Sequence, residues 1–173
     1  MKQITIRSMN KTDIDFFPAV FSEQGWDKPR ELFVSYYERQ QKREIQVFVA
    51  ETDGTPAGYV LLLPQDAHGP FAGRAIPVIS DFNVLEKYQR AGIGSRLLDA
   101  AEAAAAKTSD EVCLGGGLHS GYGPAQRLYV KRGFIPDGSG VWYQDRLLAP
   151  YMSCVNDDDL VLYLSKQFSR LDR

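Results

Sequence analysis

The sequence of 173 residues predicts a single domain, over residues 1–173, of the α+β or mixed α/β class. Three observations lead to this prediction. Runs of alternating or β-branched residues, typical of strands, occur near both ends of the chain and in its middle. Two of these runs are joined by Asp53-Gly54, a strong hairpin signal that implies antiparallel pairing. Stretches with helical spacing separate the others, in the order strand, two helices, three strands, helix, strand, helix and two strands.

The N-terminal part is expected to contain one strand followed by two helices. Alternation of apolar and polar residues over residues 3–7 predicts the strand, and Thr12-Asp13 is an N-cap signal for the first helix. The second helix is expected after Pro29, because large side chains then recur at helical spacing.

The hairpin lies in the middle of the chain and leads toward a further strand. Its two strands are expected over residues 46–51 and 57–63, and Pro64 ends the second of them. A polar loop over residues 64–75 follows, and an apolar run predicts the next strand over residues 76–84.

A long helix is expected after this strand. The alanine-rich composition gives high intrinsic helix propensity, and the apolar residues fall on one face. That face consists of Ile93, Leu97, Leu98, Ala101 and Ala105.

The C-terminal part is expected to contain a strand, a short helix, an extended stretch that resumes at Phe134, and a final strand. Residues 111–114 form the first strand, which the three following glycines are expected to end. The helix is expected between Gly123 and Gly133, where proline near the start and glycine at the C-cap mark its ends. Residues 136–159 are expected to be irregular, and residues 160–165 to form the last strand.

Composition limits the possible partners. The formal charge of −2 and a pI near 5.7 give no overall attraction to nucleic acid or to an anionic membrane, so we expect neither as a partner. Cys113 and Cys154 are expected to be reduced thiols. The N-terminal residues lack the apolar core of a signal peptide, and no apolar run reaches the length of a membrane span. These features predict a soluble, cytoplasmic protein.

A glycine-containing motif stands between the strand over residues 76–84 and the long helix. It reads Gln89-Arg90-Ala91-Gly92-Ile93-Gly94. Unpaired N–H groups at a helix start attract anions, the helix dipole favours negative charge, and glycine lets a phosphate approach the main chain. The motif therefore predicts a site for a diphosphate, to which Arg90 and Arg96 add positive charge.

Two motifs together resemble the signatures of the GNAT superfamily of acyl-CoA N-acyltransferases. The first is the glycine motif just described, which matches the acyl-CoA signature of that family. The second is Leu128-Tyr129 followed shortly by Gly133-Phe134. The resemblance implies a mostly antiparallel, splayed sheet flanked by helices. It also implies that an acetyl group passes from acetyl-CoA to an amine acceptor in a ternary complex, without a covalent enzyme intermediate.

The resemblance also assigns roles to residues. Tyr129 would act as the acid toward the leaving thiolate, and the backbone N–H of Val84 would meet the thioester carbonyl. No metal ion is expected. The residues expected to bind acetyl-CoA are Phe82, Val84, Gln89, Arg90, Ala91, Gly92, Ile93, Gly94 and Ser95.

The general base is open between two residues. The family often carries a glutamate early in the fourth strand, but the matching position here is Val78. Asp81 lies further along the same strand, although the reference pKa of an aspartate, about 3.9, is far below that of an alkylamine. His119 is the other candidate, because the reference pKa of a histidine, about 6.5, is closer to neutral pH.

Two other functions are compatible with the motifs. A catalytically silent acyl-CoA-binding module would keep the glycine motif and would not need Tyr129. A nucleotide-binding domain would use the same helix start, but the motif lacks the third glycine of a dinucleotide fingerprint. We expect a monomer or a homodimer, because an exposed final strand could pair with a second copy.

Overall fold

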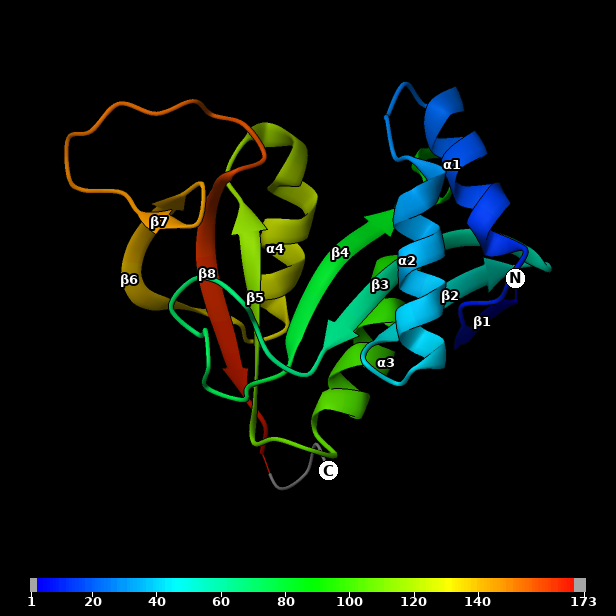
Figure 1. Cartoon of the computed structure of the whole chain (residues 1–173), viewed down its shortest axis with the longest axis horizontal. Coiled ribbons are helices and arrows are strands. Elements are labelled where there is room, and N and C mark those ends of the chain that lie inside the picture. The colour runs from blue at the N-terminus through cyan, green and yellow to red at the C-terminus, as the bar shows by residue number, and fades with distance from the viewer. Residues whose placement is uncertain (1–2, 170–173) are drawn as a thin grey trace. The chain divides into compact units, whose positions relative to one another are not determined.

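The computed structural model describes residues 3–169, which form two compact units (Figure 1). The first contains residues 3–63 and 81–102, and the second contains residues 64–80 and 103–169. Helices and strands are mixed along the chain, so the fold class predicted from the sequence is confirmed. That the whole chain forms a single domain stays a prediction.

Eight strands and four α-helices make up the described chain. The strands are β1 (Ile4–Ser8), β2 (Gln46–Thr52), β3 (Thr55–Leu63), β4 (Val78–Val84), β5 (Glu111–Gly117), β6 (Ile135–Tyr143), β7 (Arg146–Leu147) and β8 (Leu160–Gln167). The helices are α1 (Asp13–Glu23), α2 (Arg30–Gln41), α3 (Ile93–Ala105) and α4 (Gly123–Lys131), with 3-10 turns η1 (Glu86–Tyr88) and η2 (Ser120–Tyr122). None of these helices is long and apolar enough to cross a membrane.

The strands follow the hydrogen-bonded order β1-β2-β3-β4-β5-β8-β6-β7. Strands β4 and β5 pair in parallel, whereas the pairs β1–β2, β2–β3, β5–β8, β6–β8 and β6–β7 are antiparallel. The mostly antiparallel sheet flanked by helices, which the resemblance implied, is therefore confirmed.

In the first unit, α1 and α2 lie in front of strands β1–β3 and α3 lies behind them (Figure 1). Side chains alternate between the two faces of a strand, so odd-numbered positions of β2 and β3 face the helices in front. The predicted apolar face of α3 is buried, with each of its five members at most 2% exposed. The core beneath α1 and α2 consists of Met9, Ile14, Phe17, Phe21, Phe33, Ile45, Val47, Val49, Tyr59, Leu61 and Leu85.

Two glycines shape the strands of this unit. Asp53 and Gly54 have φ values of 51° and 78°, the left-handed pair that a two-residue hairpin turn needs, so the predicted hairpin is confirmed. At Gly58 a side chain would place its Cβ 2.5 Å from the carbonyl oxygen of Asn83. Only glycine therefore lets β3 approach this part of β4 so closely.

In the second unit, β8 is a central strand. It pairs with β5 on one side and with β6 on the other. The predicted strand over residues 160–165 is confirmed, but it is not an exposed edge. The expectation that this strand could pair with a second copy is therefore wrong, because both of its hydrogen-bonding edges are already used.

The three glycines of β5 lie inside the strand, which corrects the prediction that they end it. Gly115, Gly116 and Gly117 stay in register with β8. Gly117 makes room for a tyrosine ring, because a Cβ there would lie 2.3 Å from the ring of Tyr122, whereas one at Gly115 would lie 3.4 Å from that of Tyr163, an ordinary contact. Glycine here reflects side-chain packing on the strand and not a turn.

The segment over residues 136–159 is also more ordered than predicted. Its first part forms β6, which pairs with β8 through a shift in register between Pro136 and Val141. Gly138 and Gly140 within the shift have φ values of 88° and 100°. A bulged strand rich in glycine lacks the alternation by which strands are recognised in sequence, which explains the wrong prediction.

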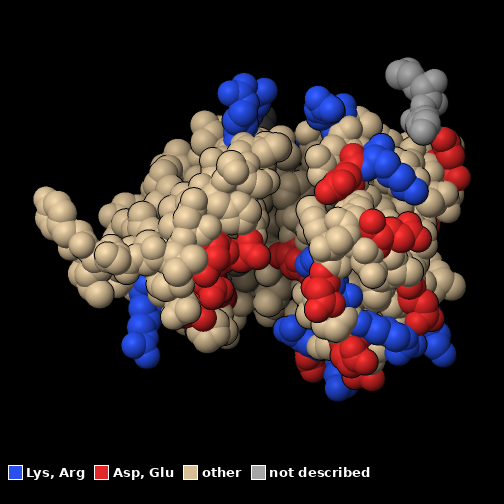
Figure 2. Space-filling view, turned by 90° about the horizontal axis from the view of Figure 1, so that it is seen from above, with Lys and Arg blue, Asp and Glu red and all other residues tan. Residues whose placement is uncertain are grey.

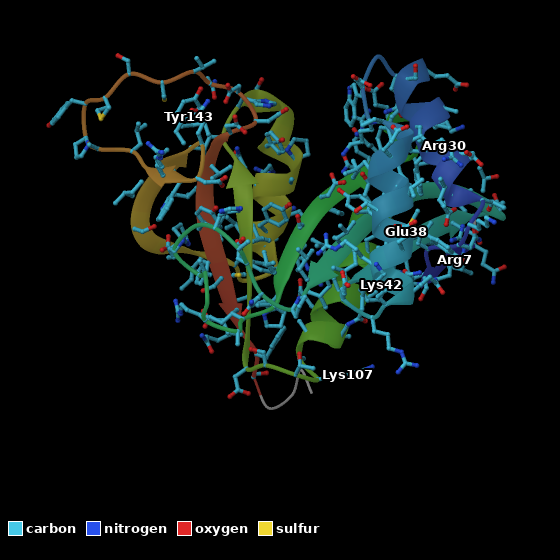
Figure 3. All side chains as sticks on the ribbon, in the orientation of Figure 1. Arg7, Arg30, Glu38, Lys42, Lys107 and Tyr143 are labelled. Carbon is cyan, nitrogen blue, oxygen red and sulfur yellow. The ribbon has the colours of Figure 1, made fainter. Side chains whose placement is uncertain are left out.

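Charged side chains are mostly interspersed on the surface, and in the view of Figure 2 neither sign forms a continuous cover. One ion pair, by contrast, contains a fully buried carboxylate. Asp13, 0% exposed, accepts two hydrogen bonds from the guanidinium of Arg7, at 2.6 and 2.8 Å, and one from the N–H of Asn10 at 2.8 Å (Figure 3 shows Arg7). Arg7 also donates to Glu51 at 2.6 Å, so it links β1, α1 and β2.

We predict that Arg7→Met lowers the free energy of unfolding by about 3 kcal/mol, because it leaves a buried carboxylate without its cation. Urea unfolding measures this change. Arg30→Met is the matched control, since the pair between Arg30 and Asp15 is 56% and 71% exposed and its loss costs about 0–1 kcal/mol. Equal losses for the two variants would show that the burial of Asp13 does not matter.

Candidate active site

The glycine motif lies between η1 and α3 in the first unit. Two of its residues have left-handed backbone, Arg90 at φ 60° and Gly92 at φ 82°. The N–H of Arg96 donates to the carbonyl of Gly92 at 3.2 Å, the bond that begins the helical ladder. The N–H groups of Ile93, Gly94 and Ser95 belong to the first turn, which has no intrahelical carbonyl to accept them. The segment therefore has the geometry of an anion site.

The space around this segment is open. A Cβ at Gly92 would meet no other atom within 4 Å, so the glycine is needed for its backbone conformation and not to relieve crowding within the chain. Arg90 and Arg96 are both exposed beside it. The side-chain amide of Gln89 donates to the carbonyl of Val84 at 3.2 Å, which ties the motif to the end of β4. The residues present thus fit a diphosphate group.

Asp81 lies on β4 with a φ of 42°, so the strand is not regular at this residue. Its carboxylate accepts four hydrogen bonds. The hydroxyls of Tyr59 and Tyr36 donate to Oδ2 at 2.6 and 2.8 Å. The ammonium of Lys28 and the amide of Asn83 donate to Oδ1 at 2.7 and 2.8 Å.

These donors decide the charge of Asp81. Burial alone would raise its pKa, but the positive charge of Lys28 and the hydrogen bonds from Lys28, Tyr59 and Tyr36 outweigh burial, so the pKa lies below its ordinary value. The carboxylate also raises the pKa of Tyr59 and Tyr36, after the larger effect of their own burial. Asp81 is thus a carboxylate that keeps its negative charge, which is unfavourable for a general base.

Lys28 belongs to none of the sequence motifs. It lies in the connection between α1 and α2, and its partner Asp81 is 53 residues away. Its ammonium also lies over the rings of Phe21 and Tyr59, 5.5 and 5.8 Å from their centroids. Only the tertiary structure brings these groups together, so a reading of the sequence misses them.

His119 caps η2 in the second unit, and both of its ring nitrogens are engaged. The N–H of Gly121 donates to Nδ1 at 3.0 Å, so Nδ1 carries no proton. The proton of the neutral ring is then on Nε2, which lies 2.9 Å from Oδ1 of Asp158. The hydroxyl of Tyr122 donates to the same oxygen at 2.9 Å. Nδ1 is therefore the nitrogen that can accept a proton from an amine, and it can do so only after its hydrogen bond from the N–H of Gly121 is broken.

Tyr129 lies on α4 and is 7% exposed. Its ring packs edge-on against Phe134 with centroids 6.0 Å apart, and it lies beside Gly116 of β5, where a Cβ would be 3.8 Å from the ring. Burial raises the pKa of Tyr129, and Tyr122 nearby raises it further. The phenol is therefore protonated at neutral pH and can serve as a hydrogen-bond donor.

The predicted site residues are divided between the two units. Asp81 lies in the first, as do the residues expected to bind acetyl-CoA, while His119 and Tyr129 lie in the second. Within residues 3–169, no group of three or more His, Cys, Asp or Glu side chains is placed to hold a metal ion.

Comparison with known proteins identifies the family. The family model of the acetyltransferase (GNAT) domain matches residues 43–136, more than half of the chain. A curated N-alpha-acetyltransferase of Sulfurisphaera tokodaii is 30% identical over 142 residues, which cover 77% of this chain and 81% of that protein. The residues that match the family model include the glycine motif, Tyr129 and Gly133-Phe134.

Solved structures show the same fold. A GNAT acetyltransferase of Desulfovibrio desulfuricans has a TM-score of 0.70 at 17% identity, with 95% of this chain and 99% of that chain covered. An acetyltransferase of Salmonella typhimurium, solved with acetyl-CoA, has a TM-score of 0.69 at 19% identity, with 96% and 95% covered. By the family match and the curated relative, the chain belongs to the GNAT family and is an acetyl-CoA-dependent N-acetyltransferase.

Proposed function

We propose that the enzyme transfers an acetyl group from acetyl-CoA to a primary amine by direct attack within a ternary complex. The observation that supports the proposal best is the open helix start at residues 90–95, with its left-handed Gly92. It offers backbone donors to a diphosphate in a chain whose net charge is −2, so the anion is captured locally.

In this proposal the cofactor binds along β4 and the motif. The diphosphate accepts hydrogen bonds from N–H groups of residues 90–95, with Gln89 tying the motif to β4. The N–H of Val84 donates to the thioester oxygen and stabilises the negative charge that develops there. Phe82, on the same strand, contacts the pantetheine arm.

The reaction makes three demands on the protein. The attacking amine must be neutral, the thioester oxygen becomes an oxyanion, and the departing sulfur must be stabilised as a thiolate. The new C–N bond forms, the C–S bond breaks, and the amine releases one proton. Tyr129 donates a hydrogen bond or its proton to the sulfur and recovers the proton from solvent. Its raised pKa favours a hydrogen bond over complete transfer, because the reference pKa of a thiol is only about 8.5.

Of the two predicted bases, we propose that His119 accepts the proton of the amine. It is 31% exposed and needs only to release the N–H of Gly121, after which Asp158 stabilises the imidazolium. Asp81 as the base stays a prediction that its lowered pKa disfavours. A water molecule can relay the proton to His119.

Cofactor binding tests the first part of the proposal. CoA should bind the wild type, and Gly92→Val should weaken binding about tenfold or more, because a side chain at this φ strains the cradle and obstructs the phosphate. Gly54→Val is the matched control, since Gly54 has φ 78° and equal open space but lies in the hairpin turn. Calorimetry that shows no CoA binding, or equal binding by both variants, contradicts the assignment.

Tyr129→Phe tests the leaving-group role. With an acceptor found by screening amines for acetyl-CoA-dependent thiol release, we expect kcat to fall about 10²- to 10⁴-fold while CoA affinity stays nearly unchanged. Tyr163→Phe removes a hydroxyl from another buried tyrosine, 6% exposed against 7% for Tyr129, and should keep the wild-type rate. Full activity of the Tyr129→Phe enzyme would show that the hydroxyl takes no part in the reaction and that this tyrosine has only a structural role.

The pH dependence of kcat/KM tests the base. The rate should rise with pH as the base loses its proton, and this acidic limb should shift or disappear in His119→Asn but persist in Asp81→Asn. Both variants are measured with the same monoamine acceptor. A limb that His119→Asn leaves unchanged and Asp81→Asn removes would reverse the assignment.

A further inference from the structure

The carboxylate of Asp81 and two aromatic rings surround an ammonium group. The Nζ atom of Lys28 is 2.7 Å from Oδ1 of Asp81 and lies over the rings of Phe21 and Tyr59. Both ring distances are below 6 Å, the range in which a cation is attracted to the face of an aromatic ring. We call Phe21, Tyr59 and Asp81 the ammonium site.

The ammonium site does not need Lys28 to hold its shape. Without the lysine, Asp81 still accepts hydrogen bonds from Tyr59, Tyr36 and Asn83. Phe21 and Tyr59 are 0% and 1% exposed and belong to the core of the first unit. The site would then be a fixed carboxylate with one open acceptor position beside two aromatic rings.

Lys28, which occupies the ammonium site, can move away more easily than the three residues that form the site. Its side chain and that of Asp81 are each 19% exposed, so solvent reaches the pair. Lys28 lies between α1, which ends at Glu23, and α2, which begins at Arg30. Its release needs a change in side-chain rotamer or in this short connection, and no helix or strand has to unfold.

We propose that the ammonium site binds a cationic group of the acceptor which does not itself react, and that Lys28 occupies this site until the acceptor displaces it. That the bound cation belongs to the acceptor rests on the proposed function, whereas the binding of an ammonium group at this site does not. The substrate class is then an amine with a second positive charge, such as a diamine or a peptide amine beside a lysine.

The charge at Asp81 explains why the bound cation is not the reacting nitrogen. A carboxylate stabilises a neighbouring ammonium in its protonated form, which cannot attack a thioester. The low pKa of Asp81 keeps the carboxylate ionised, so it holds a cation and does not remove a proton from it. The site therefore suits an anchoring charge elsewhere on the acceptor.

Binding of pentylamine, which is protonated at pH 7, tests the site without turnover. Lys28→Met removes the competing ammonium, so pentylamine should bind this variant at least about tenfold more tightly than the wild type. Lys28→Arg keeps a competing cation and should bind as the wild type does. Neutral 1-pentanol should show no such gain. If Lys28→Met does not fold, Lys28→Gln is measured in its place.

Asp81 supplies the second arm of this experiment. Adding Asp81→Asn to Lys28→Met should abolish the gain, because the anionic partner is lost. Arg30→Met removes a cation from the first turn of α2 that is 56% exposed (Figure 3) and should leave binding unchanged. Equal affinity of the wild type and Lys28→Met, or retention of the gain without the Asp81 charge, overturns the proposal.

Turnover separates this inference from the proposed function. In Asp81→Asn, kcat/KM for 1,5-diaminopentane should fall about tenfold to a hundredfold relative to kcat/KM for pentylamine, through KM, because only the diamine carries a second charge for the site to hold. If pentylamine binds as expected but neither amine is acetylated by any variant, the ammonium site stands and the proposed acceptor class fails. If both amines are acetylated but Asp81→Asn leaves their ratio unchanged, the site does not serve the acceptor.

Discussion

The arrangement around β4 in the first unit depends on the carboxylate of Asp81, whose side chain is only 19% exposed. A carboxylate removed from water costs several kcal/mol unless its oxygens are fully bonded, and here both oxygens accept two donors each. The donors come from the α1–α2 connection, from α2, from β3 and from β4 itself. The same residue carries the left-handed φ that distorts β4. The irregular course of β4 is thus stabilised by hydrogen bonds from four parts of the first unit.

The two proposed ligands have opposite charge, and the first unit has a separate place for each. In these proposals acetyl-CoA, which is anionic, meets N–H groups of the α3 helix start, whereas a cationic acceptor group meets Asp81. A net charge of −2 favours neither ligand strongly at long range. Selectivity then comes from short-range geometry, with hydrogen-bond donors at one site and acceptors at the other.

Much of the fold could be predicted from local patterns in the sequence. The apolar face of α3 follows from helical periodicity, and the hairpin follows from Asp53-Gly54, because both depend on residues close together in the chain. The glycines of β5 and the bulge of β6 could not be predicted. Their reason lies in the ring of Tyr122 and in pairing with β8, which are tertiary relations.

The candidate site divides in the same way. Gly92 belongs to a motif with a local physical reason, the turn into a helix, so its place could be predicted. The surroundings of Asp81 could not, since Lys28 and Tyr36 are 53 and 45 residues away. Charge state and hydrogen-bond saturation, which decide whether a residue can act as a base, are properties of the folded chain.

The central position of β8 has a consequence for synthesis of the protein. On the ribosome, β5 and β6 emerge before β8, yet each needs β8 as its partner. Until residues 160–167 have left the exit tunnel, both strands carry unpaired edges in a nascent chain. The first unit has all of its strands by residue 84 and can begin to fold earlier. The second unit is therefore the part of the nascent chain that exposes unpaired strand edges for the longer time.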